Sequence, residues 1–259
     1  MRIQPRAWIA LTIFVVYVAV VLTLWLALGV DYPTMQDTPE NALRALVIGI
    51  GTGGVLVAIV TTYLGWWRPA LVETRRVPRW MWVIPGLFLV MSLLNMLTVE
   101  WGALTPGHLA TLLAGVIAVG FSEELVTRGT MLVGLRSRLR EPLVWLVSTT
   151  TFMLLHAING LVGQSWSGTA SQMVVTFLLG SAFYLIRRVS GTLLLGMGLH
   201  ALYDFSLLTF DASGAEGSTL GGILGVPLYL TVIVAMALAF RKPKPSEPAT
   251  AETDTTAAS

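Results

Sequence analysis

Two adjacent carboxylates and an arginine lie inside a long apolar run of this sequence. Residues 120–129 read GFSEELVTRG. On a helix, Glu124 and Arg128 are spaced i, i+4 and share a face, where their side chains can form an ion pair. Glu123 is rotated about 100° from Glu124, so it can point into a different space. One acid can therefore be held in place while the other acts as a general base.

Two further apolar runs carry ionisable groups. Phe152 is followed four residues later by His156, and His200 is followed four residues later by Asp204. His200 and Asp204 again share a helix face. A glutamate and two histidines could activate water for hydrolysis, and the same three side chains could also be a catalytic zinc set with water as the fourth ligand. The chain has no cysteine, which excludes thiolate nucleophiles, thiolate metal sites and disulfides.

The composition is that of a protein in lipid. Hydrophobic residues make up 55% of the 259 residues and charged residues 12%, against roughly 25% charged in ordinary soluble domains. The mean hydropathy is +0.76. The basic residues are spread over the loops between apolar runs, which is a topology signal and predicts no nucleic-acid partner.

Eight segments are long enough to cross a hydrocarbon core of roughly 30 Å. The first is too long for a signal-peptide core and is interpreted as a retained span. The sequence thus predicts an all-α bundle of about eight transmembrane helices. They lie near 8–30, 42–64, 80–99, 108–134, 142–163, 169–186, 191–210 and 219–240.

The charges of the loops alternate along the chain. Of the 16 Lys and Arg residues, 14 fall in alternate loops and the terminal segments, while the opposite loops are acidic. The positive-inside rule then predicts that both termini are cytoplasmic. Counted at about 1.5 Å per residue from the cytoplasmic end of each span, Glu123 lies roughly 18 Å deep, His156 about 21 Å and His200 about 14 Å. Three spans therefore place their polar groups in one layer near mid-membrane.

We expect one integral-membrane domain over 1–240, with its motif core at about 105–210. Residues 241–259 change to Pro, Thr, Ala, Ser and Glu without hydrophobic periodicity, which predicts a disordered cytoplasmic tail. We expect the protein in the cell (plasma) membrane, among membrane lipids.

The three motifs resemble those of the CPBP family, which groups type II CAAX prenyl endopeptidases with bacteriocin-processing and immunity-linked (Abi-like) membrane proteins. The family pattern is Glu-Glu-x-x-x-Arg, Phe-x-x-x-His and His-x-x-x-Asn/Asp, each on its own membrane helix. Here it stands, in that order, as Glu123-Glu124-x-x-x-Arg128, Phe152-x-x-x-His156 and His200-x-x-x-Asp204.

The resemblance implies an eight-helix intramembrane endopeptidase whose active site opens to the cytoplasmic side. It implies that Glu123 and His156 activate a water molecule, that Glu124 and Arg128 hold the site in shape, and that His200 and residue 204 stabilise the oxyanion. The CAAX-processing members carry asparagine at the last position. An ionised Asp204 only accepts hydrogen bonds, so we expect it to orient His200 instead.

The expected function is hydrolysis of a peptide bond in a membrane-associated peptide or lipidated protein, without a cofactor. One alternative is a zinc-dependent metalloprotease that uses Glu123, His156 and His200 as ligands. Another is a non-catalytic membrane scaffold or bacteriocin-immunity protein of the same fold. A transporter is a third, because intramembrane acids and histidines also form proton relays.

Overall fold

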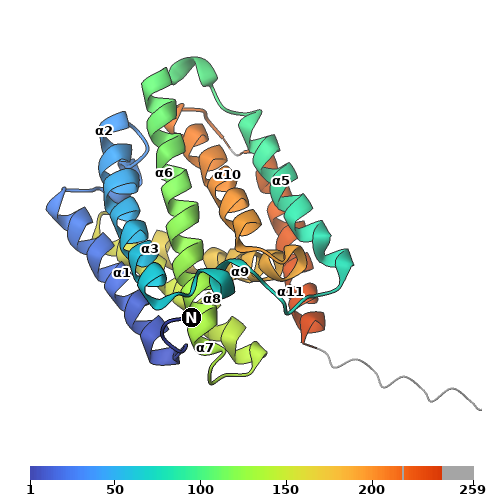
Figure 1. The fold of residues 1–259 in the computed structure, drawn as a ribbon. Helices are drawn as coiled ribbons and strands as arrows, with labels where there is room; N and C mark the ends of the chain where they lie inside the picture. Colours follow the sequence, from blue (N-terminus) through green and yellow to red (C-terminus); the bar gives the residue numbers. More distant parts are fainter. Residues whose placement is uncertain (218, 241–259) are drawn as a thin grey trace, which may run out of the picture.

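The computed structural model describes residues 1–217 and 219–240, and every regular element within these ranges is helical (Figure 1). Extended pairing in this part of the chain is limited to an isolated bridge between Val72 and Thr192. The predicted all-α class is confirmed. The tail predicted for 241–259 lies outside the described residues, and the single-domain boundary stays a prediction.

Eight helices among the described residues are long and apolar enough to span a membrane, as the sequence predicted. They are Ala7–Ala27, Pro39–Leu64, Arg79–Met96, Pro106–Leu135, Glu141–Leu161, Trp166–Ser190, Leu193–Ala212 and Leu220–Ala239. The sixth is longer at both ends than the predicted 169–186. Ser165 caps its first turn by accepting from the backbone of Gly168, and Gly191 ends it in the left-handed conformation at φ 80°.

The α-helical parts carry the labels of Figure 1. They are α1 (Ala7–Ala27), α2 (Pro39–Ala42), α3 (Gly51–Leu64), α4 (Trp67–Leu71), α5 (Val83–Met96), α6 (Pro106–Glu124), α7 (Met131–Leu135), α8 (Glu141–Leu155), α9 (Trp166–Ser190), α10 (Leu193–Ala212) and α11 (Gly225–Ala239). Two spans contain wider, π-helical segments, at Leu43–Ile50 and Leu125–Thr130. The second of these directly follows the two glutamates, and π-helical insertions are frequent at functional sites.

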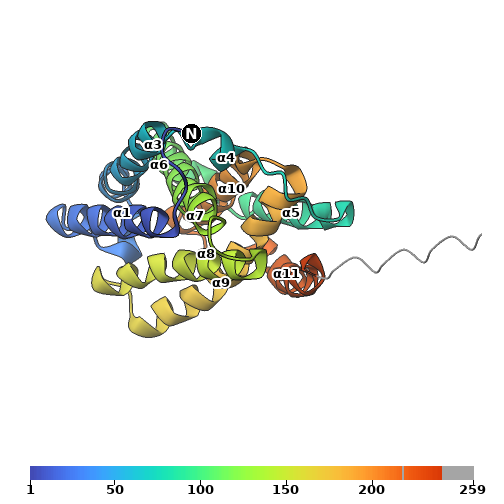
Figure 2. The same ribbon diagram turned by 60° about the horizontal axis from the view of Figure 1, so that its bottom comes forward.

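Helix α6 occupies the centre of the bundle, beside α10 (Figure 1). Small residues allow this close approach. A Cβ at Gly120 would collide with the carbonyl oxygen of Met197 on α10, and a Cβ at Gly54 on α3 would lie 2.8 Å from Ser122 of α6. Helices α8 and α9 pack against each other and run across one side of the bundle (Figure 2). The motif-bearing helices therefore meet around α6.

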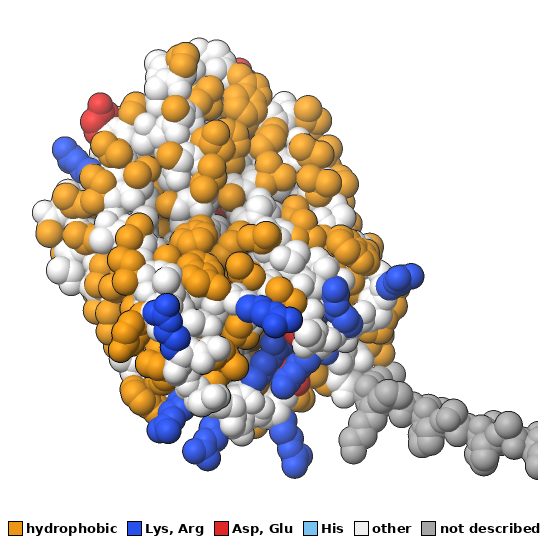
Figure 3. Space-filling view, in the orientation of Figure 1, with side chains coloured by type: hydrophobic (Ala, Val, Ile, Leu, Met, Phe, Trp, Pro, Cys, Tyr) orange, Lys and Arg blue, Asp and Glu red, His pale blue; other side chains and the backbone are white. Residues whose placement is uncertain are grey.

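The two ends of the bundle differ in charge. Arginine side chains gather at the end near the N-terminus and α7 (Figure 3). We call this the arginine-rich end, and we call the opposite one the acidic end, because its loops carry Asp31, Asp37, Glu40, Glu100 and Glu216. The side of the membrane on which each end lies stays a prediction.

A buried ion-pair network closes the arginine-rich end. Glu73, which follows α4, forms ion pairs with Arg136 at 2.9 Å and with Arg187 at 3.0 Å. Arg187 also donates to the carbonyl oxygens of Ala70 and Arg128. The network therefore ties the loop between the second and third spans to the end of α7 and to α9.

Burial acts to raise the pKa of Glu73, but the neighbouring Arg136 and Arg187 outweigh it and lower the pKa below its ordinary value of 4.5. Because the pKa of Glu73 is lower in the folded protein, the network stabilises the fold at pH values above 4.5. This stabilisation is lost as the pH falls through the lowered pKa.

We predict that Glu73→Gln lowers the free energy of unfolding at neutral pH by about 3–5 kcal/mol, because it leaves the fully buried Arg187 without its ion-pair partner. The deficit relative to the wild type should shrink as the pH falls below 4.5. Thermal unfolding in detergent over a pH series measures this, with Glu100→Gln, in an exposed loop of the acidic end, as the control. A deficit independent of pH would contradict the assignment.

Candidate active site

A fully buried ion pair between Glu124 and Arg128 lies beneath the site. The side chains of Glu124 and Arg128 are both 0% exposed, and Glu124 Oε1 accepts from Arg128 at 2.8 Å. The guanidinium carbon of Arg128 lies 3.9 Å from the centre of the Phe152 ring. A Cβ at Gly180 of α9 would lie 2.8 Å from the Arg128 guanidinium, so a glycine is needed there. The predicted i, i+4 pair thus forms, and Phe152 covers it.

His200 lies between three carboxylates. Its Nδ1 is 3.3 Å from Glu124 Oε1, while its Nε2 is 3.4 Å from Asp204 Oδ2 and 3.9 Å from Glu123 Oε2. The imidazole stacks on the ring of Phe183 at 4.7 Å between centroids. Carboxylates fix the orientation of a histidine ring when they face its nitrogens. Asp204 therefore lies where it can orient His200.

Glu123 differs from Glu124 in lining a cavity, although each acid has an Oε2 without a hydrogen-bond partner in the described ranges. Its side chain is 9% exposed, and its Oε2 makes no hydrogen bond to any residue in the described ranges. Buried carboxylate oxygens are costly unless protein or water donates to them. The Glu123 side chain lines a cavity, so water there can supply the donor.

The two ring nitrogens of His156 differ, because Nδ1 is hydrogen-bonded to the backbone and Nε2 is available as an acceptor. Its Nδ1 lies 2.9 Å from the carbonyl oxygen of Phe152. Because a carbonyl only accepts, Nδ1 carries the proton in this contact, and the Nε2 of a neutral ring is left as the acceptor. The ring borders the same cavity as Glu123, edge-on to the Phe152 ring at 5.0 Å between centroids.

The cavity has a volume of about 280 Å³, and we call it the chamber. Glu123, His156, His200 and Asp204 all line it, so the structure brings the four predicted catalytic residues to one space. Glu124 and Arg128 lie behind this wall, and Phe152 separates Arg128 from it. The roles given to these residues stay predictions.

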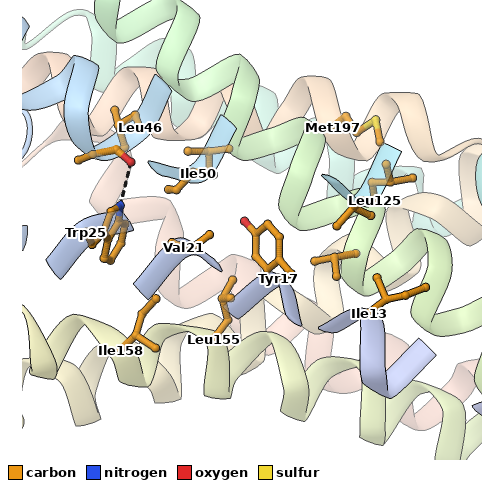
Figure 4. Packing of buried hydrophobic residues seen from close by; sticks show 14 of the residues in the cluster. Ile13, Tyr17, Val21, Trp25, Leu46, Ile50, Leu125, Leu155, Ile158 and Met197 are labelled. Carbon is orange, nitrogen blue, oxygen red and sulfur yellow. Dashed lines mark hydrogen bonds between the residues drawn. The ribbon is translucent and has the colours of Figure 1, made fainter. Parts of the chain in front are cut away.

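The first span contributes a wall that sequence reasoning missed. Tyr17, Val21 and Trp25 of α1 line the chamber, facing Leu46 and Ile50 from the second span (Figure 4). The Tyr17 hydroxyl donates to Ser122, next to Glu123, at 3.4 Å, and the Trp25 indole donates to the carbonyl of Ala45 at 2.9 Å. Their i, i+4 spacing is the one available signal, and the uniformly apolar sequence around them hides it.

No group of three or more His, Cys, Asp or Glu side chains in residues 1–217 and 219–240 is arranged to hold a metal ion. Glu123, His156 and His200, the predicted zinc set, share the chamber, but Glu124 and Asp204 face the two ring nitrogens of His200.

Fold and site together define a class: a multi-pass membrane protein with a glutamate and two histidines on a chamber inside the helix bundle. The family model described as type II CAAX prenyl endopeptidase Rce1-like matches residues 105–206, which contain all three motifs. The predicted resemblance to the CPBP family of CAAX-type proteases is confirmed over this part of the chain. No curated protein and no solved structure matches the chain.

We predict that Arg128→Gln lowers the free energy of unfolding by about 3–5 kcal/mol, because it leaves Glu124 buried without a counter-charge. The double variant Glu124→Gln/Arg128→Gln should recover part of this loss. Thermal unfolding of the purified protein measures both, and Arg138→Gln in the exposed loop after α7 is the control. A single variant as stable as the control would contradict a structural ion pair.

Proposed function

We propose that this protein is an intramembrane endopeptidase of the cell membrane that hydrolyses a peptide bond in a membrane-associated or lipidated substrate. The observation that carries the proposal is that Glu123, which is not held in the ion pair with Arg128, lines one chamber together with His156 and His200. A helix-stabilising role would leave no reason to expose a carboxylate to a cavity inside a membrane protein.

In the proposed reaction, Glu123 accepts a proton from a water molecule, and the water oxygen attacks the carbonyl carbon of the substrate. Nε2 of His156 is free to accept a hydrogen bond that positions this water. His200 donates from Nε2 to the oxyanion of the tetrahedral intermediate, while Glu124 at Nδ1 and Asp204 beside Nε2 hold the ring in orientation. The C–N bond then breaks as the amine receives the proton from Glu123, which restores the carboxylate.

This assignment gives Glu124, Arg128 and Phe152 a positioning role. Glu124 contacts both Arg128 and His200, so it links the ion pair to the proposed oxyanion donor. Arg128 in turn lies on the Phe152 ring, whose backbone carbonyl accepts from His156. The two proposed catalytic histidines are thus held by one buried assembly.

We predict that Glu123→Gln reduces cleavage by at least about 100-fold, because a general base contributes roughly 10²–10⁴ in rate. Comparative peptidomics of membranes that contain the wild type or Glu123→Gln both seeks the substrate and measures the effect. Glu100→Gln serves as the matched acid-to-amide control, and equal unfolding temperatures show that the variant is folded. Full activity of Glu123→Gln would remove the base from the mechanism. Undiminished partner binding with no cleavage in any sample would favour the scaffold or immunity alternative.

We predict that cleavage by the purified wild type survives exhaustive chelation and that elemental analysis finds no stoichiometric zinc. Loss of cleavage on chelation, with recovery on adding zinc, would instead support the metalloprotease alternative with Glu123, His156 and His200 as ligands. Calcium added back in place of zinc controls for non-specific effects of the chelator.

A further inference from the structure

The chamber extends from the catalytic layer in one direction. Its lining residues on the motif-bearing spans and α9 fall in 119–123, 152–159, 172–183 and 200–211. The inner limits of these ranges are Glu123, Phe152, Phe183 and His200, and the first three each lie beside the His200 ring. From these four residues, each range extends toward the acidic end, because α6 and α9 run away from that end and the other two spans run toward it.

The arginine-rich side of the same layer is solidly packed. Every residue from Ser122 to Leu135 is buried, as is every residue from Leu179 to Val189. Arg187 fills this region by donating to Glu73 and to the carbonyl oxygens of Ala70 and Arg128. A peptide could pass there only by breaking the buried network.

The acidic side, by contrast, has a mouth of partly exposed residues. Tyr32 and Gln172 line the chamber there and are joined by a hydrogen bond from Gln172 Nε2 to the Tyr32 hydroxyl at 2.7 Å. Asn159 donates to the side-chain oxygen of Gln172 at 2.9 Å. This chain of contacts holds the loop after α1 beside the opening. Asp211, which is exposed, lies on the same lining at the end of α10.

The charged residues along this lining are all acids. They are Glu123, Asp204 and Asp211, and the other lining residues are apolar, aromatic or neutral polar side chains and His156 and His200. A carboxylate on an entering segment would meet the like charge of Asp211 at the mouth, whereas an apolar segment with a cationic flank would fit both the walls and the mouth.

We propose that the substrate enters the chamber through the acidic end, and that the mouth at Tyr32, Gln172 and Asp211 selects an apolar segment with a cationic flank. The proposal rests on the proposed function. The family resemblance implies an active site that opens to the cytoplasm. With the arginine-rich end in the cytoplasm, as the loop charges predict, the proposed entrance lies instead on the opposite side of the membrane.

The absence of cysteine from the chain makes the route testable by single-cysteine labelling. Leu208→Cys reports the chamber lining, Glu216→Cys the acidic end and Arg138→Cys the arginine-rich end. A membrane-impermeant thiol reagent is added to sealed vesicles of each orientation. We expect Leu208→Cys to be labelled from the side that labels Glu216→Cys and not from the side that labels Arg138→Cys.

Labelling of Leu208→Cys from the Arg138 side, or from neither side while Glu216→Cys reacts, would overturn the route. Ile158→Cys, also on the lining, repeats the test if Leu208→Cys fails to fold. Labelling requires no hydrolysis, so a failed route leaves the Glu123 result intact, and a failed protease assignment leaves the route intact.

The charge preference is measured by protection of Leu208→Cys with two synthetic Leu/Ala peptides, one flanked by lysines and one by glutamates. We expect the lysine peptide to protect at a concentration up to about fivefold lower, as for a partly exposed ion pair. Asp211→Asn should reduce this ratio, with Glu216→Gln as the matched control. Equal protection by both peptides, or better protection by the glutamate peptide, would overturn the selection.

Discussion

The structure depends on the ion pair between Glu124 and Arg128, which is fully buried inside a bundle built for lipid. Charged side chains cost about 2.5–3.5 kcal/mol each at the centre of a membrane helix, so they are tolerated only where they satisfy one another. Here Glu124 supplies the counter-charge of Arg128, whose guanidinium lies on the face of Phe152, and Glu124 also contacts His200. Because Glu124 is held in this ion pair, Glu123 is the acid of the motif that lines the chamber.

The two ends of the bundle then do different things. Toward the arginine-rich end, the ion pair of Glu73 with Arg187 and the hydrogen bond of Arg187 to Ala70 join α4 and the loop after it to α9, which leaves this end tightly packed. Toward the acidic end, the walls separate enough to leave a cavity of about 280 Å³ that begins at the Glu123 layer. Packing defects cost stability in a membrane protein as elsewhere, so a cavity lined by ionisable groups indicates function rather than loose packing.

Much of this arrangement could be predicted from the sequence because lipid imposes strict rules on it. Apolar runs fixed the eight spans to within a few residues, and i, i+4 spacing predicted the contacts of Glu124 with Arg128 and of His200 with Asp204. Periodicity could not reveal Tyr17 or Trp25, because every face of α1 is apolar. Nor could it reveal the direction of the chamber, which depends on how Arg187 reaches across the bundle to Ala70.

The most direct test of the account is whether water reaches the chamber beside Glu123. Val119 and Ile117 lie two residues apart on α6, with Val119 at 5% exposure on the chamber lining and Ile117 at 55% exposure on the outer surface. Thiols react with hydrophilic reagents as thiolates, which form where water is present. The account predicts that Val119→Cys in membranes is labelled by a small hydrophilic thiosulfonate and that Ile117→Cys is not. An unreactive Val119→Cys in a folded protein would contradict a water-filled chamber at Glu123.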